Sequence, residues 1–162
     1  MIEAGSWAGE THLQKSVYFG QEIGGLPTSF GFVLYKHGPY SFQLHDALTT
    51  MRVDGLLTVV PKDPYGPSFK LGSNSARAIR RFPKTLRTHR KILEFVSKTL
   101  SVRGVAELER LATALFVYRD DEKASVEDRV TAIVDLKPHI SRESAMTAVS
   151  EVDAIVSEWT AD

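Results

Sequence analysis

The side chains in this sequence that are best suited to chemistry are cations that could bind phosphate. Residues 64–93 carry eight lysine and arginine residues and no aspartate or glutamate. Residues 94–162 carry eight cations and fourteen acids, so the net charge of zero over 162 residues hides an uneven distribution. The cations of 64–93 could attract a nucleic acid, or they could pair with the acidic helices that follow. The sequence leaves both interpretations open.

Patterns typical of catalysis and of metal or cofactor binding are absent from the sequence. There is no Gly-x-Ser-x-Gly, no Walker loop, no dinucleotide fingerprint and no His-Glu-x-x-His. The chain has no cysteine, and its five histidines form no pair four residues apart. For His37, which precedes Gly38 and Pro39, a hydrogen bond that locks the turn is favoured over a general base. We therefore expect a protein that is not an enzyme and that uses no metal or cofactor.

The elements that must position these residues begin, in residues 1–72, with the order of a winged helix. An amphipathic helix starts at Thr11, a short strand follows at 30–35, and residues 36–40 form a turn. A second helix extends from its N-cap, Ser41, to residue 54.

A β-hairpin over residues 56–71 follows the second helix and is the candidate wing. Its two strands flank a turn with three prolines, which is too rigid for the interior of a sheet. In the first helix, Leu13 and Val17 are expected to turn inward, whereas Gln14 and Lys15 are expected on the polar side.

Residues 73–162 predict a helical part of four or five helices. A short basic helix precedes Pro83, and later helices begin near Ser125 and Ser141. Helical spacing predicts a buried stripe formed by Leu86, Leu93, Val96 and Leu100, and another formed by Val105, Leu108, Ala112 and Leu115. The predicted fold is therefore α+β and mostly helical, with the helical part packed on the winged-helix-like part in one compact unit.

Composition indicates a cytoplasmic protein without a membrane partner. No stretch of about 18 apolar residues could span a bilayer, and the N-terminus lacks the basic and apolar regions of a signal peptide. The absence of cysteine suits a reducing compartment.

Nucleic-acid binding is the sharper of two functional hypotheses. The second helix of a winged helix usually enters the major groove, and here that helix is 41–54. Because it carries one arginine and two acids, Asp46 and Asp54, it would neutralise phosphate poorly. If the cations of the hairpin and the basic segment share one surface, binding would rest on phosphate contacts and its sequence specificity would be weak. The candidate nucleic-acid-binding residues lie on this helix, on the hairpin and on the basic segment: Gln43, Thr50, Arg52, Lys62, Lys70, Arg77, Arg80, Arg81, Lys84, Arg87, Arg90 and Lys91.

Binding of a protein partner is the competing hypothesis. Tyr40, Phe42 and Tyr65 lie near predicted turns and could anchor a partner protein, and the last helix could form a homodimer. The cations would then neutralise acids of the same chain, and the protein would be an interaction module that binds no nucleic acid.

Four segments of the sequence resemble one protein family. Residues 11–19 (THLQKSVYF), 35–41 (YKHGPYS), 53–57 (VDGLL) and 136–141 (LKPHIS) are similar to motifs of the YwgA-like proteins and the related SocA-like antitoxin group, called the Panacea domain. The resemblance implies a winged-helix-like front, a helical back and a role as a toxin-neutralising or adaptor protein. It implies no particular activity.

Overall fold

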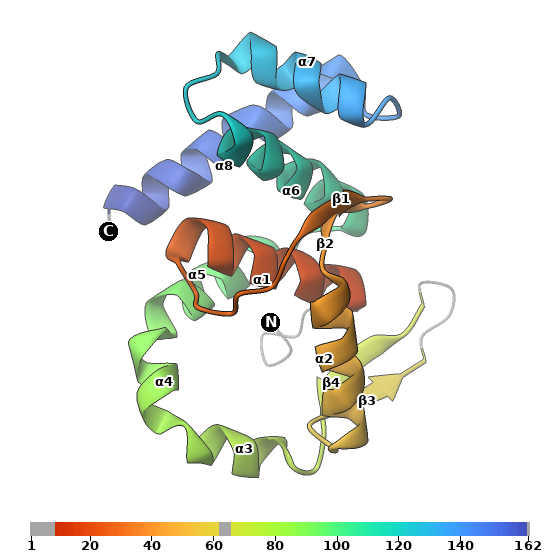
Figure 1. The fold of residues 1–162 in the computed structure, drawn as a ribbon, viewed down its shortest axis with the longest axis vertical. Coiled ribbons are helices and arrows are strands. Elements are labelled where there is room, and N and C mark those ends of the chain that lie inside the picture. Colours follow the sequence, from red (N-terminus) through yellow and green to blue (C-terminus); the bar gives the residue numbers. More distant parts are fainter. Residues whose placement is uncertain (1–8, 62–65, 162) are drawn as a thin grey trace.

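The structure, a computed structural model, describes residues 9–61 and 66–161 (Figure 1). These residues form eight helices and four strands. In chain order they are α1 (Glu10–Gly24), β1 (Val33–Tyr35), β2 (Gly38–Tyr40), α2 (Phe42–Val53), β3 (Leu57–Val60), β4 (Ser68–Leu71), α3 (Ser75–Arg81), α4 (Pro83–Thr88), α5 (Arg90–Leu100), α6 (Val105–Asp120), α7 (Val126–Leu136) and α8 (Arg142–Ala161). No helix in this part of the chain combines the length and hydrophobicity that a membrane span needs. The predicted fold class, α+β and mostly helical, is confirmed, and the strands form two small antiparallel sheets.

The elements divide between the two ends of the long axis of the molecule. Helices α6, α7 and α8 pack on one another at one end, while α2, the β3–β4 hairpin, α3 and α4 lie at the other (Figure 1). Helix α1 lies between them and packs against α5 and α6. Helix α1 therefore links the small sheets to the helical part.

Each small sheet is an antiparallel hairpin. Strand β3 pairs with β4 and contacts α2, so the hairpin predicted at 56–71 is present. Strand β1 pairs with β2 in a register that sets Tyr35 opposite Gly38. The prediction of a turn over all of 36–40 was therefore wrong. The turn is confined to residues 36 and 37, because Gly38 has a φ of +79° and lets the chain return as a strand.

Several helix ends follow local signals that the sequence displays. Gly25 adopts a φ of +61° and ends α1, and Gly55, with a φ of +69°, follows α2. The Ser41 hydroxyl accepts a hydrogen bond from the Leu44 backbone N–H at 3.2 Å and caps α2. The Ser125 hydroxyl caps α7 through the Asp128 N–H at 3.1 Å.

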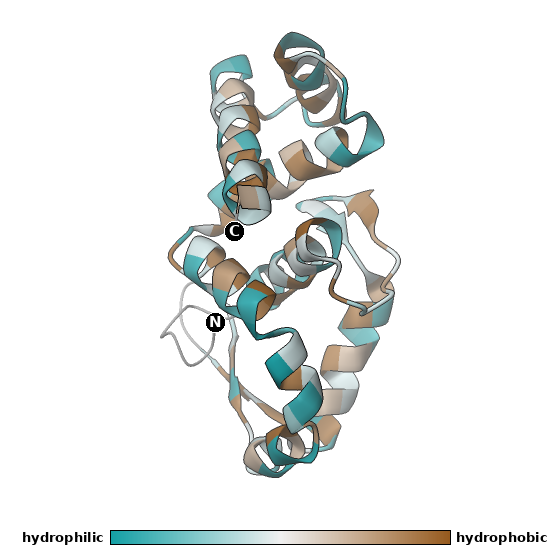
Figure 2. Ribbon diagram, turned by 90° about the vertical axis from the view of Figure 1, so that its left-hand side faces the viewer, coloured by the Kyte–Doolittle hydropathy of each residue, from teal (hydrophilic) through white to brown (hydrophobic). Residues whose placement is uncertain are grey.

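The apolar side chains collect in two clusters. The larger one joins α1, α5, α6, α7 and α8, and the smaller one consists of Leu44, Leu48 and Leu57 with partly buried neighbours that include Val17 and Phe69. Along the helices, hydrophobic and hydrophilic residues alternate, as expected of helices that bury one face (Figure 2).

The predicted stripes of the helical part needed correction. The described residues after 72 form six helices rather than four or five, because breaks at Phe82 and His89 divide residues 75–100 into three. The break at His89 resets the helical register, so Ile92 is buried while Leu86 and Leu93 are exposed. Val105 is also exposed, since it is the first residue of α6.

Candidate functional site

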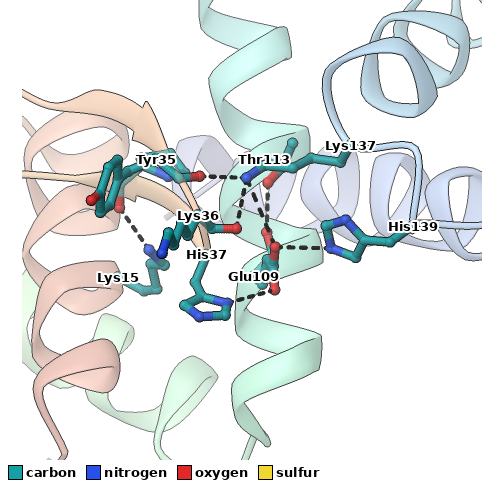
Figure 3. A network of polar contacts seen from close by, with 9 residues as sticks. Lys15, Tyr35, Lys36, His37, Glu109, Thr113, Lys137 and His139 are labelled. Atoms are coloured by element: carbon teal, nitrogen blue, oxygen red, sulfur yellow. Dashed lines mark hydrogen bonds and ion pairs between the residues drawn. The ribbon is translucent and has the colours of Figure 1, made fainter.

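Segments from four parts of the chain meet at one junction on α6. They are residues 14–15 of α1, the β1–β2 hairpin with Ser41, Glu109 of α6, and the loop between α7 and α8 (Figure 3). We call this contact network the hairpin junction. Three of its four parts coincide with segments on which the family resemblance depends.

Gln14 and Lys15 fasten the hairpin to α1. The Gln14 amide donates to the carbonyl oxygen of Ser41 and accepts from the Ser41 N–H, each at 2.9 Å. The Lys15 ammonium donates to the carbonyl oxygen of Pro39 at 2.6 Å. Both side chains are 1% exposed, so their predicted place on the polar side of the helix was wrong. Their hydrogen bonds satisfy backbone groups of the hairpin that water cannot reach.

Glu109 lies at the centre of the hairpin junction. One of its carboxylate oxygens is 3.3 Å from Nδ1 of His37, and the other is 3.1 Å from Nε2 of His139. Lys137 Nζ lies 3.9 Å from Glu109 and donates to the carbonyl oxygens of Tyr35 and Lys36. Glu109 and Lys137 are buried, whereas the side chains of His37 and His139 are 66% and 60% exposed.

The contacts of the hairpin junction hold the β1–β2 hairpin in place. Each buried ammonium group binds a backbone carbonyl, and Glu109 provides the countercharge. His37 makes the hydrogen bond that the sequence predicted for it, to a partner 72 residues away. In the described part of the chain, no group of three or more histidine, cysteine or acidic side chains is arranged to hold a metal ion.

Gly38 allows the hairpin to approach α6 closely. A Cβ atom at this position would lie 3.2 Å from the Thr113 hydroxyl and 3.3 Å from the carbonyl oxygen of Glu109, and the φ of +79° is unfavourable for any L side chain. Glycine is therefore the residue that this position accepts.

Replacing Gly38 with alanine should lower the free energy of unfolding by about 2 kcal/mol, from backbone strain and overpacking together. Gly25→Ala is the matched control, because Gly25 also has a positive φ, of +61°, but a Cβ there would meet nothing within 4 Å. The control should lose about 1 kcal/mol from strain alone. Equal losses in urea denaturation of the two variants would contradict a tight contact at Gly38.

Three aromatic rings form an exposed patch beside the hairpin junction. Ring centroids of Tyr35, Tyr40 and Phe42 lie 5.2–5.7 Å apart, and Phe42 is 57% exposed. The Tyr40 hydroxyl donates to Glu10 at 2.8 Å, and Nδ1 of His45 lies 2.8 Å from the same oxygen. We call the rings of Tyr35, Tyr40 and Phe42 the aromatic face. The structure thus brings Tyr40 and Phe42 together as a candidate anchor, while Tyr65 lies outside the described residues.

Electrostatic contacts stabilise the ionised form of Glu10 under the aromatic face. Burial raises the pKa of Glu10, but hydrogen bonds from His45 and Tyr40 outweigh it and leave that pKa lowered. The hydrogen bond between Glu10 and His45 also raises the pKa of His45. Tyr40 is therefore held by an ionic group rather than by apolar packing alone.

The predicted basic segment forms an exposed arm. We define the basic arm as α3, α4 and residues 90–91, and its cations are all exposed: Arg77, Arg80, Arg81, Lys84, Arg87, Arg90 and Lys91. Helix α3 contacts α4, and α4 in turn contacts α5.

The cations of the basic arm do not pair with the acidic helices of the C-terminal part. Within the described residues, the arm forms one ion pair, between Arg90 and Glu94 of the same helix at 2.7 Å. Lys91 lies over the Trp159 ring at 5.2 Å. Acids of α6, α7 and α8 pair instead with cations outside the arm, such as Asp153 with Arg129 at 2.6 Å.

The candidates on α2 have local contacts of their own. Gln43 is in the first turn of α2, and its side chain accepts from the Gly31 N–H at 2.9 Å. Thr50 donates to the carbonyl oxygen of Asp46 at 3.0 Å. Arg52, in the last turn, lines a shallow groove of about 450 Å³ against β3.

The wing contributes one described candidate. Lys70 is exposed on β4, while Lys62 lies outside the described residues. The structure therefore groups seven of the candidate cations on the basic arm, while Gln43, Thr50, Arg52 and Lys70 lie on α2 and β4.

The sequence did not single out Glu109, Lys15, Lys137 or His139 as site residues. Lys137 and His139 lie in the segment 136–141 on which the family resemblance depends, and that resemblance could have pointed to them. Glu109 offers a weaker signal, because it is an acid directly after Leu108 in the mostly apolar stretch from Leu108 to Leu115. Contacts that join positions 15, 109 and 137 arise only in the folded chain.

Comparison with family models and curated proteins gives no match, so function has to be inferred from the geometry of the structure. No protein-family model matches this chain, and a search of curated proteins finds no match. Two surfaces are therefore candidates for recognition: the basic arm, and the aromatic face that the hairpin junction supports.

Proposed function

We propose that this chain is a non-enzymatic recognition protein of the antitoxin, adaptor or regulator type, which binds nucleic acid through the basic arm. Helix α2 and the β3–β4 hairpin would contribute to the same surface, as in a winged helix. The observation that supports this proposal most is that seven exposed cations form a single ion pair within the described residues.

Uncompensated cations on one arm favour an anionic partner for two reasons. Positive charges with no acid among them repel one another, so a polyanion that neutralises them gains free energy. Counterions released from the nucleic acid add to that gain, and binding becomes strongly dependent on salt. Helix α2 adds Arg52 but also Asp46, so the binding is expected to discriminate poorly between sequences.

Charge reversal on the basic arm tests the proposal. We expect wild-type protein to bind DNA at about 0.1 M salt and to release it by about 0.3 M. Arg80/Arg81/Arg87→Glu should weaken binding at least about tenfold, because three phosphate contacts become repulsive. Fluorescence anisotropy with a labelled oligonucleotide measures both effects.

The matched control reverses three exposed lysines outside the arm. Lys36/Lys98/Lys123→Glu changes the net charge equally but leaves the basic arm intact, so its affinity should stay within about threefold of wild type. Equal losses in the two triple variants, or no loss in either, would remove the basic arm as the binding surface.

The aromatic face supports a second candidate function, binding of a protein partner. Exposed aromatic side chains that are rigidly held are typical anchors of protein interfaces, and here the hairpin junction holds them. A toxin-neutralising protein would copurify with the product of a neighbouring gene even at about 0.5 M salt, where phosphate contacts fail. Salt-resistant copurification without DNA binding would favour this candidate over the first.

We further propose a cytoplasmic location. The absence of cysteine and the family resemblance support it.

A further inference from the structure

A shallow pocket of about 420 Å³ lies where the basic arm meets the end of α2. Its lining includes Phe82, Arg77 and Arg81 from the arm and Asp54 from the C-cap of α2. Phe82 is 58% exposed and belongs to neither apolar cluster. The pocket thus combines an open aromatic ring with two guanidinium groups.

The backbone at Phe82 explains why the ring is exposed. Helix α3 ends at Arg81 and α4 begins at Pro83, so Phe82 separates them with φ −125° and ψ 49°. Pro83 cannot continue α3, because proline lacks the N–H that a helix interior requires. The break between the two helices therefore holds Phe82 out of the helical register, in the same pocket as Arg77 and Arg81 of α3.

An aromatic ring among arginines fits a single strand better than a duplex. In a single strand the bases are free to stack on aromatic side chains while cations follow the backbone. In a duplex both faces of each base are already stacked on neighbouring pairs, so the ring gains little contact. Arg77 and Arg81 form no ion pair among the described residues, which leaves them available for phosphate.

We infer that this pocket binds single-stranded nucleic acid, with one base stacked on Phe82 and the adjacent phosphates on Arg77 and Arg81. The inference rests on the proposed function and specifies its ligand. Asp54 adds one acid to the pocket, against two arginines in its lining. Asn74, whose side chain is fixed by donation to the carbonyl oxygen of Asp54 at 2.8 Å, completes its polar side.

Anisotropy titrations with two labelled probes test this inference. One probe is an oligothymidine of about 12 nucleotides, and the other is a hairpin duplex of similar length. At about 0.1 M salt, wild-type protein should bind the single strand more tightly. Phe82→Ala should weaken binding to the single strand on the order of tenfold and binding to the duplex less than about twofold. A parallel titration with oligouridine distinguishes RNA from DNA.

Two further variants separate stacking from general damage. Leu86→Ala removes another exposed apolar side chain of the basic arm but no ring, so both affinities should stay within about twofold of wild type. Phe82→Trp should keep the affinity, and its fluorescence should fall when the single strand binds, after subtraction of the wild-type signal.

The outcomes distinguish failure of this inference from failure of the proposed function on which it rests. If wild-type protein binds neither probe, the proposed function fails together with the inference. If wild-type protein binds both probes and Phe82→Ala weakens both equally or neither, the single-strand pocket alone is overturned.

Discussion

Glu109→Gln is expected to lower the free energy of unfolding by about 3 kcal/mol, since it leaves buried positive charge without a countercharge. Glu109 is the acid of the hairpin junction, and the buried Lys137 lies 3.9 Å from it. Glutamine keeps the size and one acceptor oxygen but removes the charge. Urea denaturation near pH 7 measures the loss.

Glu143→Gln provides the matched control for this substitution. Glu143 is an exposed acid of the neighbouring helix α8, and its replacement should change stability by less than about 0.5 kcal/mol. A loss below about 1 kcal/mol in Glu109→Gln would show that the lysines of the hairpin junction do not depend on this carboxylate.

Lys15 is expected to make the protein more stable as the pH rises from about 8 to about 10.5. Burial lowers the pKa of Lys15 to about 8, although Glu109 opposes this shift and Lys137 adds to it. Between these pH values the unfolded chain holds a proton on Lys15 that the folded chain has released. Because the unfolded state then binds more protons, stability increases with pH.

Comparison with Lys15→Met isolates this effect. The difference in unfolding free energy, wild type minus variant, should grow by up to about 3 kcal/mol between pH 7.5 and pH 10.5. Burial raises the pKa of Tyr18, so Tyr18 lowers stability at high pH in both proteins, and its contribution cancels in the difference. A difference that does not vary with pH would mean that Lys15 is not titrated in this range.

The pH prediction is linked to Glu109. Because the carboxylate raises the pKa of Lys15, Glu109→Gln should lower that pKa further. The same pH series in the Glu109→Gln background would therefore begin its rise at a lower pH than in wild type.

Local features of the fold could be predicted from the sequence because they depend on neighbouring residues. Ser41 and Ser125 cap helices through N–H groups three residues away, and Gly25 and Gly55 supply backbone angles that other residues avoid. The hairpin at 56–71 likewise depends on its own two strands.

Burial of polar side chains could not be predicted in this way. Gln14 and Lys15 look like solvent-facing residues because their polarity is visible, while the carbonyl groups that need them lie 27 and 24 residues away, respectively. Similarly, nothing in the spacing of residues 86–100 shows that His89 interrupts the helix and buries Ile92 in place of Leu93. Such outcomes are decided by tertiary contacts, which outweigh local preference.

Exposure of the basic arm could not be predicted from the sequence, although its cations could be recognised there. The sequence identified an acid-free segment and left open whether acids of the same chain would neutralise it. The answer required the positions of the acidic helices, which pair elsewhere within the described residues. The wing and α2 candidates stay predictions.

The bonds from Lys137 to the backbone of Tyr35 and Lys36 join positions 102 and 101 residues apart. During synthesis the N-terminal segments emerge first, so the carbonyl groups of the β1–β2 turn wait for their donor until the α7–α8 loop has been made. The contacts that hold the aromatic face in place are therefore completed late. A chain interrupted before residue 137 would lack the two hydrogen bonds from Lys137, and its aromatic face would be held less firmly.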